Sequence, residues 1–122
     1  MKKVLIVDDE PFILEGLQHS LTDKGFDVTT AENGENALSL LSQSYHPDLV
    51  ITDIIMPEKD GIEVIWSLKE KYPDVRIIAI SGGGRISATD HLKIAKKLGA
   101  DAILTKPFST DELMETIETL NL

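Results

Sequence analysis

Residues 3–10 read Lys3-Val4-Leu5-Ile6-Val7-Asp8-Asp9-Glu10, an apolar run that stops abruptly at three consecutive carboxylates. Further short apolar runs occur at Leu49–Thr52, Val75–Ile80 and Ala102–Leu104. Runs of this kind, bounded by polar residues, are typical of buried strands. The polar residues that follow them are Asp8, Asp9, Asp53, Ser81 and Lys106. If the strands are parallel, these side chains converge at one edge of one sheet, where open α/β sheets place their chemistry.

Segments with helical periodicity and good start or stop signals lie between the predicted strands. The first begins at Pro11 and stops at Gly25, the second opens at Asn33-Gly34, and the third runs from Asp60-Gly61 to a point before Pro73. The fourth closes at Gly99, and the last opens at Ser109–Glu112. In chain order, their apolar faces consist of Ile13, Leu14, Leu17 and Leu21; Ala37, Leu38 and Leu41; Ile62, Ile65 and Leu68; Leu92, Ala95 and Leu98; and Leu113, Ile117 and Leu120. The spacing of Ser109 and Glu112 is that of a capping box.

Alternating strands and helices of this length predict a doubly wound α/β fold with five parallel strands and helices on both faces. The second strand, Phe26–Thr30, alternates and is less apolar, so it suits an edge. This favours the strand order 2-1-3-4-5 of the flavodoxin-like fold, whose crevice would lie between Asp8-Asp9 and Asp53. We expect residues 1–122 to form a single domain without an output domain.

The composition narrows the class of protein. The chain has 122 residues, 42% of them apolar and 27% charged, which is typical of a globular domain. Its net charge of −9 argues against direct nucleic-acid binding, which depends on clustered Lys and Arg. There is no cysteine, no run long enough to span a bilayer, and no signal-peptide core, because the first apolar run ends at Asp8. We therefore expect a cytoplasmic protein that does not associate with a membrane.

The carboxylates suggest phosphoryl chemistry. Asp53, at the end of a strand, is a candidate nucleophile that could form an acyl phosphate; alternatively, it caps a helix or lies in a solvated turn. Asp8 and Asp9 are candidate Mg²⁺ ligands, since magnesium prefers oxygen ligands and is often held by one or two carboxylates plus phosphate oxygens. The alternative for this pair is N-capping of the first helix, and both roles can hold together.

Lys106 would bring a positive charge to the same edge, suited to a carboxylate or to a phosphoryl oxygen. Pro107 follows it, and an X-Pro bond at this edge is a candidate for the cis form. Ser81 could donate its hydroxyl to the same oxygens. The run Gly82–Gly84 either exposes backbone N–H groups to an anion or forms a simple turn.

Motifs in a fixed order reveal a family resemblance. They are Val7–Pro11 (Val-Asp-Asp-Glu-Pro), Thr52–Pro57 (Thr-Asp-Ile-Ile-Met-Pro) with Asp60-Gly61, Ile80–Gly82 (Ile-Ser-Gly) and Thr105–Phe108 (Thr-Lys-Pro-Phe). From Lys3 to Leu120 the chain resembles the receiver domains of two-component response regulators, particularly the stand-alone chemotaxis type. Such domains take a phosphoryl group from a histidine kinase or phosphotransfer protein and catalyse only their own phosphorylation and dephosphorylation.

The resemblance implies a role for each site residue. Asp53 matches the phosphoacceptor, and Asp8 and Asp9 match the magnesium-binding pair. Asp53 itself and the main-chain carbonyl of Ile55 would be further ligands of Mg²⁺. Ser81 matches the switch hydroxyl, and Lys106 matches the lysine that precedes a cis proline. Phosphorylation would then change the surface of the fourth helix, fifth strand and last helix, through which the domain binds a downstream protein or dimerises.

Several positions depart from the family pattern. Ile103 stands where the family usually carries an aromatic residue coupled to the switch hydroxyl, so we expect that coupling to be weakened or replaced. Ile55 and Gly83 stand where side chains influence the access of water, which leaves the lifetime of the phosphoryl group open. Gly82–Arg85 is rich in glycine, which suggests a loose switch loop or a partner contact.

Three other classes of protein share some of these sequence features. A receiver-like binding module that acts without phosphorylation stays open. A haloacid-dehalogenase-type phosphatase also uses a strand-end aspartate and magnesium, but it needs a second acid where Ile55 stands. A flavin or nucleotide binder would need a phosphate-binding loop after the first strand, where Asp8–Glu10 would repel an anion. A basic face formed by Lys93, Lys96 and Lys97 either meets an acidic partner or is simply solvated.

Overall fold

The computed structural model describes residues 1–43, 45–54, 61–81, 93, 96, 97 and 99–122, with the side chains of residues 61, 62 and 81 left out. The described elements are β1 (Lys3–Val7), α1 (Pro11–Asp23), β2 (Asp27–Ala31), α2 (Gly34–Ser42), β3 (Leu49–Asp53), α3 (Gly61–Lys71), β4 (Arg76–Ser81), β5 (Ala102–Thr105) and α5 (Thr110–Thr119). The predicted fourth helix falls mostly outside the described residues.

The strands form one parallel sheet in the order β2-β1-β3-β4-β5, which confirms the predicted fold class. The register brings the carboxyl ends of the strands into line. Val7 pairs with Ala31 on one side and Thr52 on the other, and Ser81 pairs with Thr105. Residues that end or follow these strands therefore share one edge of the sheet.

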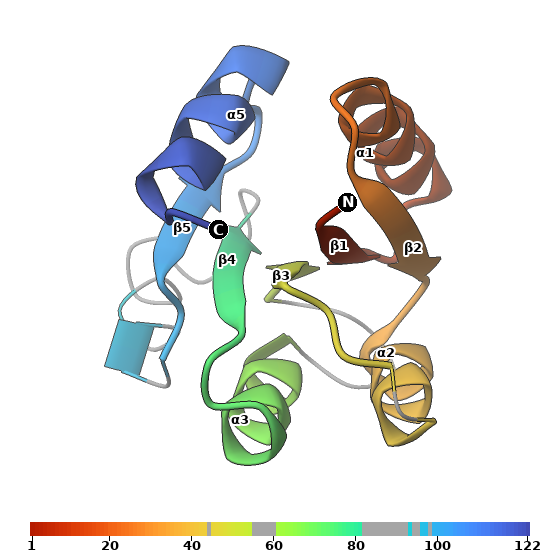
Figure 1. Cartoon of the computed structure of the whole chain (residues 1–122), viewed down its shortest axis with the longest axis vertical. Helices are drawn as coiled ribbons and strands as arrows, with labels where there is room; N and C mark the ends of the chain where they lie inside the picture. Colours follow the sequence, from red (N-terminus) through yellow and green to blue (C-terminus); the bar gives the residue numbers. More distant parts are fainter. Residues whose placement is uncertain (44, 55–60, 82–92, 94–95, 98) are drawn as a thin grey trace.

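Helices cover both faces of the sheet (Figure 1). Helices α1 and α5 lie on one face, and α2 and α3 lie on the other. Because successive strand residues point to opposite faces, β1 sends Val4 and Ile6 into the core under α1 and α5, and Leu5 and Val7 into the core under α2 and α3. Burial on both faces explains why the strands are apolar runs rather than alternating ones. Each fully buried aliphatic side chain contributes roughly 1.5–3 kcal/mol.

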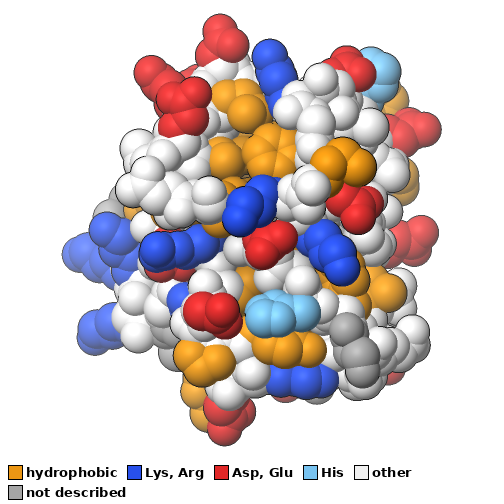
Figure 2. Space-filling view, viewed as in Figure 1, with side chains coloured by type: hydrophobic (Ala, Val, Ile, Leu, Met, Phe, Trp, Pro, Cys, Tyr) orange, Lys and Arg blue, Asp and Glu red, His pale blue; other side chains and the backbone are white. Residues whose placement is uncertain are grey.

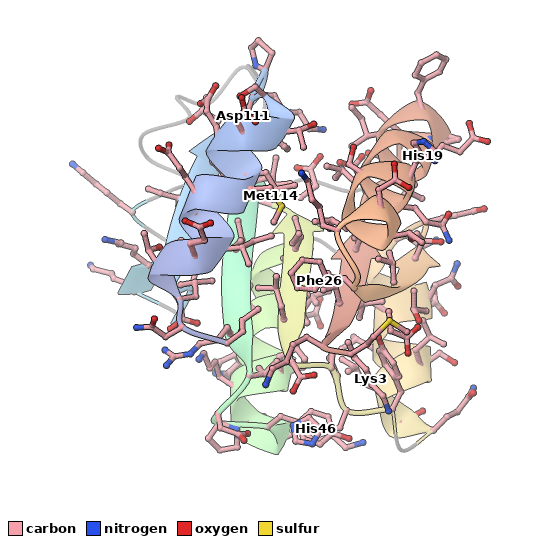
Figure 3. The ribbon with its side chains drawn as sticks, turned by 45° about the horizontal axis from the view of Figure 1, so that its top comes forward. Lys3, His19, Phe26, His46, Asp111 and Met114 are labelled. Atoms are coloured by element: carbon pink, nitrogen blue, oxygen red, sulfur yellow. The ribbon has the colours of Figure 1, made fainter. Side chains whose placement is uncertain are left out.

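The core under α1 and α5 is bordered by side chains that are only partly buried. Phe26 and Met114 point into the space between these helices (Figure 3), and both pack against the buried cluster that contains Leu14 and Leu113. The predicted apolar face of α5 is confirmed, since Leu113, Ile117 and Leu120 are all buried.

Two predicted helix starts are confirmed. The Asn33 side chain accepts a hydrogen bond from the Asn36 N–H at 2.8 Å and caps α2. Ser109 caps α5 in a complete capping box, because its hydroxyl accepts from the Glu112 N–H at 3.1 Å while the Glu112 carboxylate accepts from the Ser109 N–H. Gly25 has a φ of 94°, a left-handed conformation that suits glycine after the end of α1.

Other details differ from the sequence-based expectation. The second strand is shifted by one residue and runs Asp27–Ala31, because its register is set by pairing with β1. Asp53 and Ser81 are the last residues of β3 and β4 rather than residues beyond them. Helix α1 has Glu10, not Asp9, at its N-cap position. The bond between Lys106 and Pro107 is cis, as anticipated.

The charges are unevenly spread over the surface. Figure 2 shows one face of the molecule, with Lys and Arg side chains gathered at its left edge and acidic side chains at its top. Lys93, Lys96 and Lys97 are exposed, while the rest of the predicted basic helix lies outside the described residues. Within the described part of the chain, no helix combines the length and apolar character that crossing a membrane requires.

Candidate functional site

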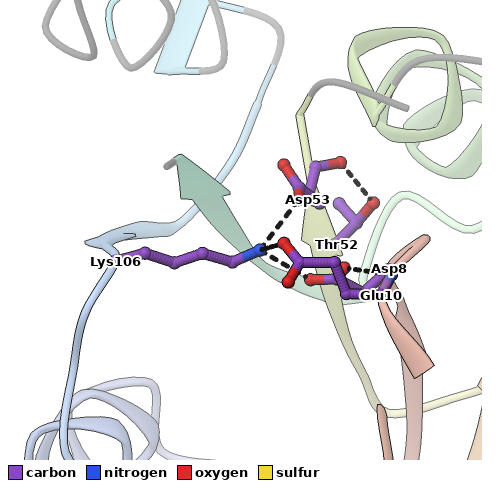
Figure 4. A network of polar contacts seen from close by, with 5 residues as sticks. All are labelled: Asp8, Glu10, Thr52, Asp53 and Lys106. Atoms are coloured by element: carbon purple, nitrogen blue, oxygen red, sulfur yellow. Dashed lines mark hydrogen bonds and ion pairs between the residues drawn. The ribbon is translucent and has the colours of Figure 1, made fainter. Parts of the chain in front are cut away.

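A cluster of charged side chains lies at the carboxyl edge of the sheet (Figure 4). Asp8 directly follows β1, Asp53 ends β3, and Lys106 directly follows β5. Because β1 and β3 are neighbours, their carboxylates stand side by side, and Lys106 reaches toward them from beyond β4. The structure thus brings together residues that are far apart in the sequence.

The ammonium group of Lys106 is the centre of this cluster. Its Nζ lies 3.1 Å from Asp53 Oδ2, 3.1 Å from Asp8 Oδ2 and 3.3 Å from Glu10 Oε1. It donates hydrogen bonds to Asp53 and Glu10. One cation therefore contacts three carboxylates, an arrangement that leaves the cluster with surplus negative charge.

Asp8 is fully buried, and its two carboxylate oxygens differ. Oδ1 accepts a hydrogen bond from the Glu10 N–H at 2.9 Å. Oδ2 forms the ion pair with Lys106 but has no hydrogen bond of acceptable geometry among the described residues. Burial raises the pKa of Asp8, and this effect outweighs the Glu10 N–H and Lys106, which lower it.

The pKa of Lys106 is also raised, but here the neighbouring charges rather than burial decide the direction. Burial alone would lower its pKa, but the negative charges of Asp8 and Asp53 and the hydrogen bond to Asp53 outweigh burial and raise the pKa. The ammonium group is thus held in its charged form across the physiological range. A permanent positive charge beside Asp53 is suited to contact with an anionic group at that position.

The carboxylates fit a divalent cation. Oxygen atoms of Asp8, Asp9 and Glu10 lie within 4.8 Å of one another, Asp8 buried and the other two exposed. A buried carboxylate oxygen without a hydrogen bond, Asp8 Oδ2, is the kind of hard ligand that Mg²⁺ takes in proteins. Asp8, Asp9 and Asp53 would hold the ion at this edge of the sheet.

The backbone around Asp53 is fixed by the sheet. The Ile54 N–H donates to the Ile80 carbonyl at 3.0 Å, and the Thr52 hydroxyl donates to the Asp53 carbonyl at 2.9 Å. The Asp53 side chain is 10% exposed, so it is largely buried at the carboxyl edge of the sheet. The backbone that carries the Asp53 carboxylate is therefore held in place at the edge of the sheet.

Not every predicted site residue falls within the described part of the chain. The backbone of Ser81 ends β4 at the same edge and pairs with Thr105, but its side chain is not among the described ones. Ile55 and Gly82–Gly84 also lie outside the described residues. The roles assigned to Ser81 and to the Ile55 carbonyl stay predictions.

Glu10 is a site residue that the sequence-based reasoning did not assign. Its carboxylate contacts Lys106, which lies 96 positions further along the chain. The only sequence signal was its place as the third of three consecutive carboxylates. A helix start offers an ordinary explanation for an acidic residue there, and so this signal was not specific.

A comparison with protein families settles the relationship. Residues 4–118 match the model of the response regulator receiver domain. The chain belongs to the response regulator receiver domain family. Receiver domains are signalling modules rather than conventional enzymes.

Solved structures of receiver domains resemble the chain over nearly its whole length. Response regulator TrrA from Thermotoga maritima, solved in complex with Mg²⁺-BeF, shares 38% identity with a TM-score of 0.84, over 98% of this chain and 99% of that one. Chemotaxis protein CheY4 from Vibrio cholerae shares 30% identity with a TM-score of 0.87, over 98% of both chains. A CheY-like receiver domain protein from Methanospirillum hungatei shares 27% identity with a TM-score of 0.90, over 99% of this chain and 94% of that one.

Receiver domains also occur within longer proteins. The chain matches NtrX from Brucella abortus at 30% identity with a TM-score of 0.86, over 97% of this chain but only 26% of NtrX. The family thus accounts for the fold and the general signalling role.

Proposed function

We propose that this receiver domain accepts a phosphoryl group on Asp53 in a Mg²⁺-dependent reaction, with a histidine kinase or phosphotransfer protein as donor. The observation that carries the proposal is the placement of Asp53, a largely buried carboxylate at the end of β3 whose Oδ2 lies 3.1 Å from the ammonium group of Lys106. An Asp53 oxygen would form the new O–P bond while the bond between phosphorus and the donor breaks. We place this exchange in the cytoplasm, with a downstream protein as receiver of the signal.

The neighbours of Asp53 support this chemistry. A phosphoryl group that approaches several carboxylates meets strong repulsion, which Lys106 counters from beside Asp53. Asp8 and Asp9 would hold Mg²⁺, which supplies positive charge to the phosphoryl oxygens when bound. The Mg²⁺-BeF complex of TrrA, 38% identical to this chain, supports the same choice of cation here.

Phosphorylation would reach the surface through β4 and β5. Ser81 ends β4, and its backbone pairs with Thr105, the residue before Lys106. A dianion on Asp53 would attract both the Ser81 hydroxyl and Lys106, and so would pull on two adjacent strand ends. The surface that responds would include β5, α5 and the exposed Lys93, Lys96 and Lys97.

The central test is phosphorylation by a small donor. The protein is incubated with acetyl phosphate and Mg²⁺, and its intact mass is measured. We expect the wild type to gain the mass of one phosphoryl group, and Asp53→Asn to gain none, because an amide is not a nucleophile for phosphorus at neutral pH. Asp23→Asn, the same change at an exposed position on α1, is the matched control and should gain mass as the wild type does.

The same experiment separates the alternatives. If neither acetyl phosphate nor any histidine kinase adds mass to the wild type, the proposal is wrong and the binding module that acts without phosphorylation is favoured. Release of many equivalents of phosphate per protein from a small phosphate ester would instead favour the phosphatase. For the output surface, affinity capture of partners by beryllofluoride-loaded and unloaded protein is compared, with Asp53→Asn as control.

A further inference from the structure

The side chain of Glu10 does not serve the helix that it begins. Glu10 occupies the N-cap position of α1 with extended backbone angles, yet its side chain makes no capping hydrogen bond. Residues that cap helices well at this position are Ser, Thr, Asp and Asn. The Glu10 carboxylate instead accepts a hydrogen bond from Lys106 Nζ at 3.3 Å. Helix capping therefore does not account for glutamate at this position.

The three carboxylates around Lys106 are not equivalent. The side chain of Asp8 is fully buried and that of Asp53 is 10% exposed, whereas that of Glu10 is 59% exposed. Glu10 is thus the outermost partner of the ammonium group. Its backbone N–H also holds Asp8 Oδ1 at 2.9 Å, so the Glu10 main chain is fixed relative to the deepest carboxylate of the site.

We infer that Glu10 is a positioning residue that gives Lys106 an alternative partner when Asp8 and Asp53 are engaged by a divalent cation. This inference rests on the proposed cation site, and it adds a residue to which no role has been assigned. Asp8 and Asp53 cannot serve Lys106 and a cation equally, because two positive charges then compete for the same oxygens. Of the three carboxylates that the described residues place against Lys106, Glu10 is then the one left to pair with it.

Glu10 therefore lowers the energetic cost of cation binding through Lys106. Without the Glu10 carboxylate, Lys106 loses its remaining ion pair as Asp8 and Asp53 turn to the cation. The competing route is a direct effect of Glu10 on the cation, since a Glu10 carboxylate oxygen lies within 4.8 Å of oxygens of Asp8 and Asp9. The effect of Glu10 through Lys106 requires Lys106, whereas a direct effect of Glu10 on the cation does not. The Mg²⁺ affinity of variants that lack Lys106 therefore separates the two.

A double-mutant cycle in Mg²⁺ affinity tests this dependence. The dissociation constant for Mg²⁺ is measured by isothermal titration calorimetry for the wild type, Glu10→Gln, Lys106→Met and the double variant. We expect Glu10→Gln to weaken Mg²⁺ binding about three- to fivefold in the presence of Lys106, since an exposed ion pair contributes up to about 1 kcal/mol. In the Lys106→Met background we expect at most about a twofold effect.

Two controls sharpen the result. Glu15→Gln removes the same charge from an exposed position on α1 and should leave the Mg²⁺ affinity within about twofold of the wild type. Glu10→Asp keeps the charge on a shorter side chain and should recover part of the loss. Circular dichroism checks that each variant is folded, and Lys106→Gln replaces Lys106→Met in the cycle if the methionine variant is not.

Either of two outcomes would overturn the inference. One is an unchanged Mg²⁺ affinity in Glu10→Gln. The other is an equal loss with and without Lys106, which would mean that Glu10 acts on the cation itself. Because Mg²⁺ binding needs no phosphoryl donor, a failure of phosphorylation on Asp53 leaves this test intact.

Discussion

Asp8 illustrates at the scale of one residue how the site places function above stability. Its carboxylate is fully buried, and burial raises its pKa above the ordinary value of 3.8. An acid whose pKa is raised on folding binds its proton more tightly in the folded state, so the ionised form costs folding free energy at neutral pH. A fully neutral core residue would be more stable, but it could not bind a cation.

We therefore predict that Asp8→Asn raises the midpoint of thermal unfolding at neutral pH in the presence of EDTA. A rise of about 4 °C corresponds to roughly 1 kcal/mol in a domain of this size. The cost of the ionised carboxylate appears as the pH rises through 3.8, the unfolded-state value, and is complete above the raised folded-state pKa. The gain should thus vanish in unfolding scans below pH 3.8. A lower midpoint for Asp8→Asn at neutral pH would contradict this account.

Glu10 adds a second lesson at this scale. Its position in the sequence is equally compatible with a helix start and with a site ligand. Only its contact with Lys106, at 3.3 Å, separates the two, because Lys106 comes from the other end of the chain.

At the scale of the elements, α5 has the most complete N-terminal capping of the described helices. Its capping box is complete, and its first turn carries Asp111 and Glu112, which are favourable near the positive end of the helix dipole. The helix follows the turn that begins with Lys106, so its start helps to anchor the segment that carries this lysine.

We predict that Ser109→Ala lowers the free energy of unfolding by about 1 kcal/mol, because the Glu112 N–H loses its partner. Urea denaturation followed by circular dichroism measures the loss. Ser42→Ala is the matched control: the Ser42 hydroxyl is exposed and only donates to the Ser39 carbonyl at the end of α2, so we expect a change within about 0.5 kcal/mol. Equal losses in the two variants would rule out a specific capping effect.

Strand β5 has four residues, and Leu104 is the only one of them that is buried. Ile103 is partly buried and packs against the core under α2 and α3. The site where the family usually carries an aromatic residue is therefore used here for packing. How Ser81 and β5 respond together to phosphorylation stays a prediction.

At the scale of the whole molecule, the negative charge dominates. The chain carries a net charge of −9, and the site concentrates Asp8, Asp9, Glu10 and Asp53 at one edge of the sheet. Salt screens the diffuse repulsion between surface charges, whereas a cation bound among these carboxylates would offset the repulsion that Lys106 leaves uncompensated.

We predict that Mg²⁺ stabilises the folded protein more than NaCl of the same ionic strength. A ligand that binds only the folded state adds roughly 2.7 kcal/mol at a hundred times its dissociation constant. Thermal unfolding of the wild type in the two salts measures the difference, which should disappear in Asp8→Asn. Identical midpoints in MgCl₂ and NaCl would show that the site does not select the divalent cation.

Much of the fold could be read from the sequence. The apolar runs predicted the strands, and the weaker alternation of residues 26–30 placed β2 at an edge. The starts of α2 and α5 were predicted from Asn33 and Ser109, since capping depends on neighbours a few residues apart. The one-residue shift of β2 was missed because its register depends on pairing with β1.

The sequence by itself determined where the strands lie along the chain, to within a residue or so at their ends, and the parallel α/β order, because both follow from local patterns repeated along the chain. Only the tertiary structure decided the distances at the site. Lys106 meets Asp53 across 53 positions and Glu10 across 96, and both contacts exist because the sheet brings the ends of β1, β3 and β5 to one edge. Burial, and with it the raised pKa of Asp8, likewise depends on packing by residues from the whole chain.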